Sequence, residues 1–215
     1  MNDPQATLDH LVAAELIDLK QPEKSLLLQK PTQQVKHGGG QKMTIGDRTY
    51  SQFRRFIDDL AAVKDGKYSR ASELPTPNAE VSQATEISFK LENVPEDWDQ
   101  KLLQVDLHRW DEATKSWSSE RWATGDRTVF GKGKLWQQHL SVTAPRDSAR
   151  AAAPAKDKRL PPGKYLAKVY LDRDGKLKAD YPTTLSAADV VAEIEVTSQW
   201  PEGYGRMTIA KFRAK

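Results

Sequence analysis

The sequence predicts an α+β chain in which a small N-terminal helical segment precedes an antiparallel β-sandwich. Two segments near the N-terminus, 6–19 and 47–63, place their apolar residues at the spacing of an amphipathic helix. From residue 86 onward, apolar and polar residues alternate, as is typical of half-buried strands. Several short strands separated by turn signals favour a sandwich over other β architectures.

Domain boundaries follow from changes in composition along the 215 residues. Residues 64–84 are polar and include Pro75 and Pro77, so we interpret them as a linker. This predicts a helical segment over 1–63 and a sandwich over 85–215. Within the sandwich, residues 146–158 are rich in alanine, proline and charge, and they predict a mobile loop.

The helical segment contains two amphipathic helices with a glycine-rich loop between them. Asp3 or Thr7 is a candidate cap for the first helix, and Asp47 for the second. The second helix carries its apolar residues on one face: Tyr50, Phe53, Phe56, Ile57, Leu60 and Ala61. The loop His37-Gly38-Gly39-Gly40 is either a flexible connector or a segment packed closely against a flat ligand or a helix.

Strict alternation assigns side chains to the two faces of the first strands. The residues expected to face the core are Ile87, Phe89 and Leu91 in one strand and Leu103, Val105 and Leu107 in the next. The same alternation places Trp110 on the outer face. A hairpin turn is predicted between Trp110 and Trp117.

Composition excludes several classes of protein. The 33 basic and 30 acidic residues are interleaved and give a net charge of only +3, so no nucleic-acid partner is expected. No apolar run approaches the roughly 18 residues of a membrane helix, so no transmembrane segment is predicted. The absence of cysteine excludes disulfides, thiolate metal sites and covalent CxxCH haem attachment. The sequence also lacks the common hydrolase and phosphate-binding motifs, which favours a non-enzymatic protein.

Three features of the N-terminal segment point to a known family. They are LVAAELIDLKQPEKSLLLQKP at 11–31, HGGG at 37–40 and the aromatic-rich helix that ends near Leu60. Together they resemble the C-terminal part of the planctomycete-type cytochrome c domain, although the CxxCH segment of that domain is absent. The resemblance implies a cytochrome-like helical fold and a periplasmic or extracellular location. LPPGKYLAKVYLD at 160–172 resembles the turn and strand of transthyretin-like or carboxypeptidase-regulatory-like modules.

The resemblance also identifies candidate haem ligands. It makes His37 and Met43 possible axial residues, since imidazole and thioether both bind haem iron. The alternative is that His37 caps a loop while Met43 packs in a helical core. We expect no cofactor, with haem as the alternative if it is held non-covalently or if the CxxCH segment lies outside this chain.

The six tryptophans all fall in the predicted sandwich. The candidate ligand-binding surface consists of Trp110, Trp117 and Trp122 with Arg109 and Arg121. Such a mixed aromatic and cationic surface suits an acidic glycan or a protein partner, while core packing is the alternative for each ring. The expected function is a non-catalytic, exported binding or interaction module. Electron transfer by bound haem and carbohydrate binding are the alternatives.

Overall fold

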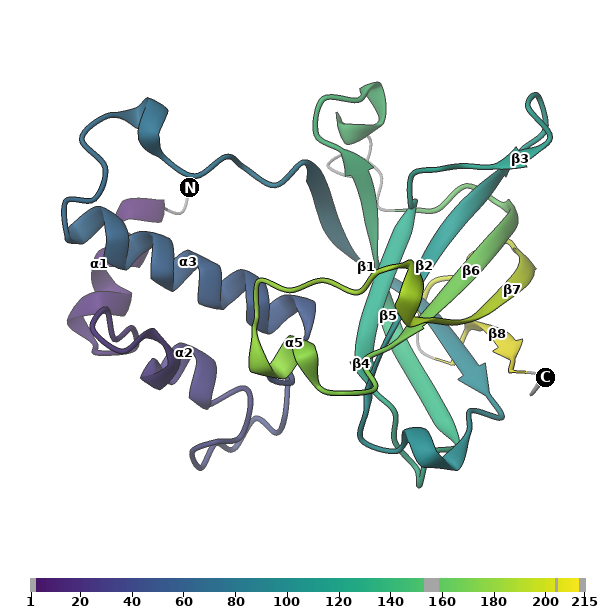
Figure 1. The fold of residues 1–215 in the computed structure, drawn as a ribbon, viewed down its shortest axis with the longest axis horizontal. Helices are drawn as coiled ribbons and strands as arrows, with labels where there is room; N and C mark the ends of the chain where they lie inside the picture. The colour runs from purple at the N-terminus through teal and green to yellow at the C-terminus, as the bar shows by residue number, and fades with distance from the viewer. Residues whose placement is uncertain (1–2, 153–158, 204, 213–215) are drawn as a thin grey trace. The chain divides into compact units, whose positions relative to one another are not determined.

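The computed structural model describes residues 3–152, 159–203 and 205–212. The chain divides into two compact units (Figure 1). The first unit comprises Met1–Thr76 together with Lys176–Thr183, and the second comprises Pro77–Gly175 and Thr184–Lys215. A short segment from late in the sequence is therefore part of the helical unit.

The helical unit contains α1 (Pro4–Ala13), α2 (Leu26–Gln29), α3 (Arg48–Lys64) and α5 (Lys176–Ala179), with short 3-10 turns at Pro22–Lys24 and Ala71–Glu73. Asp3 caps α1 by accepting from the backbone N–H groups of residues 5 and 6. Asp47 caps α3 by accepting from Tyr50 N at 2.7 Å. The predicted helix over 47–63 corresponds closely to α3. Helix α1 ends six residues earlier than the predicted 6–19, and Glu15 adopts a positive φ of 55°.

The core of this unit is small and covers only one side of α3. Its buried members are Ile17, Leu28, Met43, Tyr50 and Ile57. Phe53 and Phe56, which were predicted on the same face as Tyr50, are 38% and 42% exposed. The apolar stripe of α3 is thus wider than the surface that the rest of the described unit covers.

The late segment Lys176–Thr183 is held against this unit by close contacts. Gly46 has φ +95°, and a Cβ there would lie 2.8 Å from the carbonyl carbon of Leu177. The Tyr181 hydroxyl donates to Asp58, and the Arg54 guanidinium lies 5.3 Å from the Tyr181 ring centroid. Glycine at position 46 is therefore what allows the backbone of α5 to approach so closely.

The second unit is built from eight strands that form one sheet: β1 (Glu80–Glu92), β2 (Leu102–Asp111), β3 (Ser116–Trp117), β4 (Ala123–Thr128), β5 (Leu135–Pro145), β6 (Gly163–Leu171), β7 (Val190–Ser198) and β8 (Met207–Lys211). Their order is β7-β6-β2-β4-β5-β1-β8, with β3 paired to β2 outside this path. All pairs are antiparallel except β1 with β8. Short 3-10 turns occur at Glu96–Trp98, Ala149–Ala152 and Ala187–Asp189.

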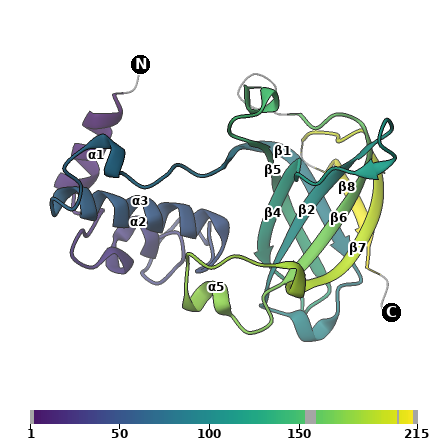
Figure 2. The ribbon, with the colours of Figure 1, turned by 45° about the horizontal axis from the view of Figure 1, so that its top comes forward.

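The predicted fold class, a helical segment followed by a β-sandwich, is wrong. The described residues are mostly β, with four α-helices, and the strands form a single nearly closed, barrel-like sheet (Figures 1 and 2). The hydroxyls of Ser198 on β7 and Thr208 on β8 hydrogen-bond to each other and so connect the two edges. A sandwich would contain two separate hydrogen-bonded sheets, whereas here one continuous series of strand pairs runs from β7 to β8.

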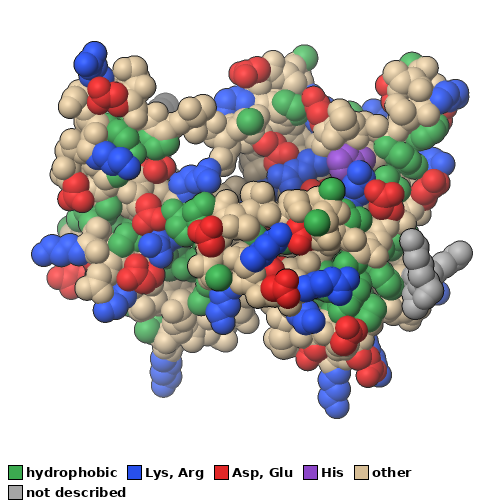
Figure 3. Space-filling model, in the orientation of Figure 1, with side chains coloured by type: hydrophobic (Ala, Val, Ile, Leu, Met, Phe, Trp, Pro, Cys, Tyr) green, Lys and Arg blue, Asp and Glu red, His purple; other side chains and the backbone are tan. Residues whose placement is uncertain are grey.

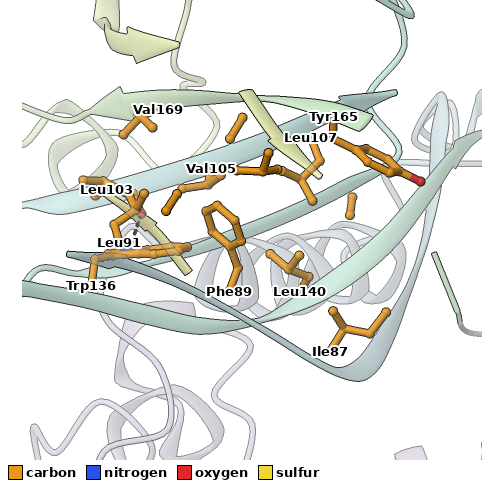
Figure 4. Close-up of a cluster of buried hydrophobic side chains, with 14 of the residues drawn as sticks. Ile87, Phe89, Leu91, Leu103, Val105, Leu107, Trp136, Leu140, Tyr165 and Val169 are labelled. Carbon is orange, nitrogen blue, oxygen red and sulfur yellow. Dashed lines mark hydrogen bonds between the residues drawn. The ribbon is translucent and has the colours of Figure 1, made fainter. Parts of the chain in front are cut away.

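The inside of the barrel is filled by apolar side chains (Figure 4). The six residues that alternation placed in the core are all fully buried: Ile87, Phe89, Leu91, Leu103, Val105 and Leu107. Trp136 also lies inside, where its indole N–H donates to Leu103 O and Arg127 O at 3.1 and 3.0 Å. Seven strands follow one another around the barrel, one fewer than the eight whose interior is just wide enough for side chains to fill, so a packed apolar interior is expected.

Candidate functional site

The tryptophans of the barrel divide into two groups. Trp98, Trp136 and Trp200 are buried in its core. Trp110, Trp117 and Trp122 are half-buried, and of these only Trp122 packs against the core. The rings of Trp110 and Trp117 therefore have no role in the barrel interior.

Trp110 and Trp117 form an aromatic pair on the outer face of the sheet. They are register partners in the β2–β3 hairpin, and their rings meet edge to face with centroids 4.9 Å apart. Lys164 Nζ lies 5.2 Å from both centroids and is ion-paired with Glu195 at 2.8 Å. We call Trp110, Trp117 and Lys164 the outer aromatic cluster.

Arg109 and Trp122 lie at the end of the barrel where β2 finishes and β4 begins. The Arg109 guanidinium carbon is 5.0 Å from the Trp122 ring centroid. Arg150, from the 3-10 turn Ala149–Ala152, is 4.3 Å from the same centroid. Arg150 also donates to Thr143 O at 2.6 Å and to Glu120 at 3.0 Å. The part of the predicted mobile loop that contains Arg150 is thus bonded to the barrel, and residues 153–158 lie outside the described ranges.

Arg121 is held in a network of ion pairs instead of contributing to an aromatic surface. Its guanidinium bonds two oxygens of Glu80 at 2.6 and 2.9 Å and both oxygens of Asp106 at 3.2 Å. Asp106 is only 6% exposed and also accepts from Thr124 and Gln104. Burial alone would lower the pKa of Arg121, but the bonds and charges of Glu80 and Asp106 outweigh it and raise that pKa.

The predicted five-residue surface is therefore separated into three environments. Trp110 and Trp117 are together on the outer face, Arg109 and Trp122 are together at the barrel end, and Arg121 is in the ion-pair network. Sequence reasoning missed Lys164 and Arg150, since no local pattern brings either residue to the tryptophans. On the face of the molecule drawn in Figure 3, basic and acidic side chains are interspersed.

His37 and Met43 lie in different environments. Met43 is 6% exposed and belongs to the helical core. His37 is exposed, and its Nε2 would lie 2.5 Å from a Cβ at Gly39, so the imidazole lies against the loop backbone. Because one side chain is enclosed by helices while the other is exposed, the described residues do not form an axial pair that fits haem.

The described part of the chain has neither a membrane-spanning helix nor a group of side chains placed to hold a metal ion. None of the described helices combines the length and apolarity that a membrane span needs. Within the described ranges, no cluster of three or more histidine or carboxylate side chains is arranged to hold a metal ion. Comparison with family models, with curated proteins and with solved structures finds no match for this chain.

Proposed function

We propose that this chain is a non-catalytic binding module whose binding surface is the outer aromatic cluster. The observation that carries the proposal is that the rings of Trp110 and Trp117 meet edge to face outside the barrel core. Tryptophan supplies large contact area with few rotatable bonds and is enriched among the residues that dominate binding energy. Two such rings on an outer sheet face are available to a partner.

The charges around the cluster favour a protein as that partner. Lys164 and Glu195 form one ion pair beside the rings, and Glu112 and Lys115 form another in the hairpin turn at 2.7 Å. An aromatic centre surrounded by exposed charges of both signs is the usual composition of a protein interface. The expected partner presents an apolar side chain to the rings and complementary charges to the two ion pairs.

Carbohydrate binding by the same rings is the second candidate. A sugar ring stacks on an open aromatic face. Lys164 lies near both ring centroids, so a stacked sugar would have to displace it from its ion pair with Glu195. Arg121, which would have favoured an acidic glycan, is engaged by Glu80 and Asp106. These contacts make a glycan the less favoured ligand.

The test compares Trp110→Ala with Phe53→Ala, which removes an exposed aromatic ring from the helical unit. A partner captured from the producing cells is purified, and its dissociation constant is measured by calorimetry. Trp110→Ala should weaken binding about tenfold or more, because residues that dominate an interface commonly contribute that much. Phe53→Ala should leave binding unchanged.

Stability and glycan binding are measured on the same proteins. Trp110→Ala should lower the unfolding free energy by only about 1 kcal/mol, because the half-buried ring loses its edge-to-face contact with Trp117 but leaves no cavity in the core. A loss of about 3 kcal/mol would show that the ring supports the fold and would overturn the proposal. Binding to a glycan panel that Trp110→Ala abolishes, without a protein partner, would assign the surface to carbohydrate.

Export remains a prediction that follows from the cytochrome resemblance, and haem binding remains its alternative. Fractionation of the producing cells tests export. For haem, we expect the purified chain to show no Soret absorption. A Soret band that disappears in His37→Ala would instead make His37 a ligand and support the electron-transfer alternative.

A further inference from the structure

Strand β7 is an edge of the barrel sheet with unpaired backbone groups. Among the described strands it pairs only with β6, so it lies at one end of the strand order (Figure 2). In a strand paired on one side, every second residue points its N–H and C=O away from the partner. Over 190–197, no described residue hydrogen-bonds to these outward groups. The strand therefore presents a row of free donors and acceptors.

Strand β8 does not cover the first half of β7. It begins after the loop that follows β7, and the two strands touch at that loop, where the Ser198 and Thr208 hydroxyls bond to each other. β8 ends at Lys211, three residues after Thr208, so along β7 it would reach back no farther than Glu195. Residues 190–194 therefore lie beyond the end of β8.

The inner side chains of β7 are less covered than those of its neighbour. Ala192 and Ile194 face the barrel interior beside their register partners on β6, Val169 and Ala167. The two β6 residues are fully buried, whereas Ala192 and Ile194 are only partly buried. β6 has a strand on both sides and β7 has one on a single side, which explains the difference. One added strand would cover these side chains and bring the strands around the barrel to eight.

The outer side chains at this edge are acidic. Glu193 and Glu195 are each ion-paired to a lysine of β6, at 3.5 Å to Lys168 and at 2.8 Å to Lys164. The glutamate side chains remain 52% and 57% exposed, so each carboxylate can accept from a second cation on its free side. A basic side chain opposite each glutamate would form a favourable cross-strand pair.

These glutamates argue against a second copy of the chain as the occupant. Two β7 strands paired antiparallel about Ile194 would place Glu193 of each copy opposite Glu195 of the other. Centring the pair on either glutamate would place that residue opposite itself. Like charges directly opposite each other destabilise a strand pair, so the edge favours an occupant of opposite charge.

We propose that the free edge of β7 binds an extended segment of a protein partner in which basic and apolar residues alternate. The segment adds to the sheet as a strand, and its backbone bonds to the outward groups of β7. Its apolar side chains cover Ala192 and Ile194, and its basic side chains bond to Glu193 and Glu195. This site does not require the rings of Trp110 and Trp117, so its failure would leave the proposed function standing.

The probe is a blocked heptapeptide of alternating lysine and valine, titrated into the full chain at constant ionic strength. NMR follows the amide resonances of β7, and hydrogen exchange identifies the amides that become protected. We expect saturable shifts over 190–195, with protection gained by every second amide. Three control peptides should bind about tenfold more weakly or less: alternating glutamate and valine, the same lysines and valines in two blocks, and the probe methylated on every backbone nitrogen. Absence of saturable shifts, or equal binding of any control peptide, would overturn the proposal.

The double substitution Glu193→Gln with Glu195→Gln tests the protein side. It should weaken probe binding about threefold to tenfold, as for loss of two exposed ion pairs. Glu92→Gln is the matched control, because Glu92 is ion-paired to Lys90 at 2.7 Å on β1, a strand with partners on both sides. Glu92→Gln and Trp110→Ala should leave binding unchanged. An equal loss in either control would contradict the assignment to the β7 edge.

Sedimentation and hydrogen exchange of the peptide-free chain test the other occupants. We expect a monomer in which the outward amides of 190–194 exchange freely. A dimer with these amides protected would assign the edge to a second copy. Protection that disappears when the chain is shortened to end at Phe212 would assign it to residues 213–215, which lie outside the described ranges. Either result would overturn the proposal.

Discussion

Removing the guanidinium of Arg121 should destabilise the barrel strongly. The side chain joins the start of β1 to β2 by bonding Glu80 and Asp106 with four contacts of 2.6–3.2 Å. In Arg121→Gln, Asp106 would keep only the neutral donors Thr124 and Gln104 while remaining 6% exposed. A buried carboxylate without a cationic partner is therefore the main cost.

The expected loss of unfolding free energy is about 2–3 kcal/mol. Breaking one side of a fully buried ion pair costs about 3–5 kcal/mol. The side chains of Arg121 and Glu80 are each 28% exposed, so solvent screening reduces the effect at this pair. Lys134→Gln is the control, because its ion pair with Glu96 is largely exposed and should contribute less than about 1 kcal/mol.

Urea unfolding followed by tryptophan fluorescence measures this loss in the barrel alone. All six tryptophans lie in the second unit, so the signal does not report the helical unit. With a slope of about 1–3 kcal/mol per molar urea, a loss of about 2–3 kcal/mol should lower the unfolding midpoint by about 0.7–3 M. In a double-mutant cycle, Asp106→Asn should recover part of the loss, with a coupling of about 1–3 kcal/mol. A change below about 0.5 kcal/mol for Arg121→Gln, or fully additive effects, would refute the reasoning.

Three further predictions concern packing, backbone and titration. Trp136→Phe should lower the unfolding free energy by about 2–4 kcal/mol in the same assay, since it leaves a cavity and removes the indole donor from two carbonyls. A loss below about 1 kcal/mol would contradict the placement of Trp136 in the barrel core. Gly46→Ala should destabilise the helical unit more than Gly66→Ala, because both glycines have positive φ but only position 46 has the backbone of Leu177 at 2.8 Å. Hydrogen exchange of the α5 amides measures the difference, and equal exchange rates in the two variants would argue against close packing of α5 on Gly46. The pKa of Tyr165, raised to about 12 in the folded state, makes the folded protein the better proton binder above pH 10, so stability should fall as pH rises from about 10 to 12. Urea unfolding across that pH range should show a smaller decline in unfolding free energy for Tyr165→Phe than for the wild type. Identical declines would contradict the raised pKa of Tyr165.

The sequence by itself determined the local structure of several elements. The period of α3 and its Asp47 cap, and the alternation that buries Leu103, Val105 and Leu107, agree with the structure. These features depend on backbone geometry that repeats every 3.6 or 2 residues, so neighbouring residues suffice to predict them. The same alternation correctly separated Trp110 from the barrel interior.

Only the tertiary structure decided how the strands form a sheet. Alternation tells which side chains face a core, but it does not tell whether that core lies between two sheets or inside one. The parallel pairing of β1 with β8 joins residues more than 100 positions apart, such as Ser88 and Met207. Local sequence carries no signal for such a contact, and the predicted sandwich was wrong for this reason.

The candidate sites depended on tertiary contacts to the same degree. Arg121 is bonded to Glu80, and Arg150 lies over Trp122, although each pair is far apart in sequence. The predicted surface contained Trp110 and Trp117, but it also included Arg109 and Arg121. Arg109 precedes Trp110 in β2 and therefore points to the opposite face, and Arg121 bonds to Glu80 and Asp106. Charged side chains are long and can bond to residues of distant elements, so their positions in the sequence do not determine what they bind.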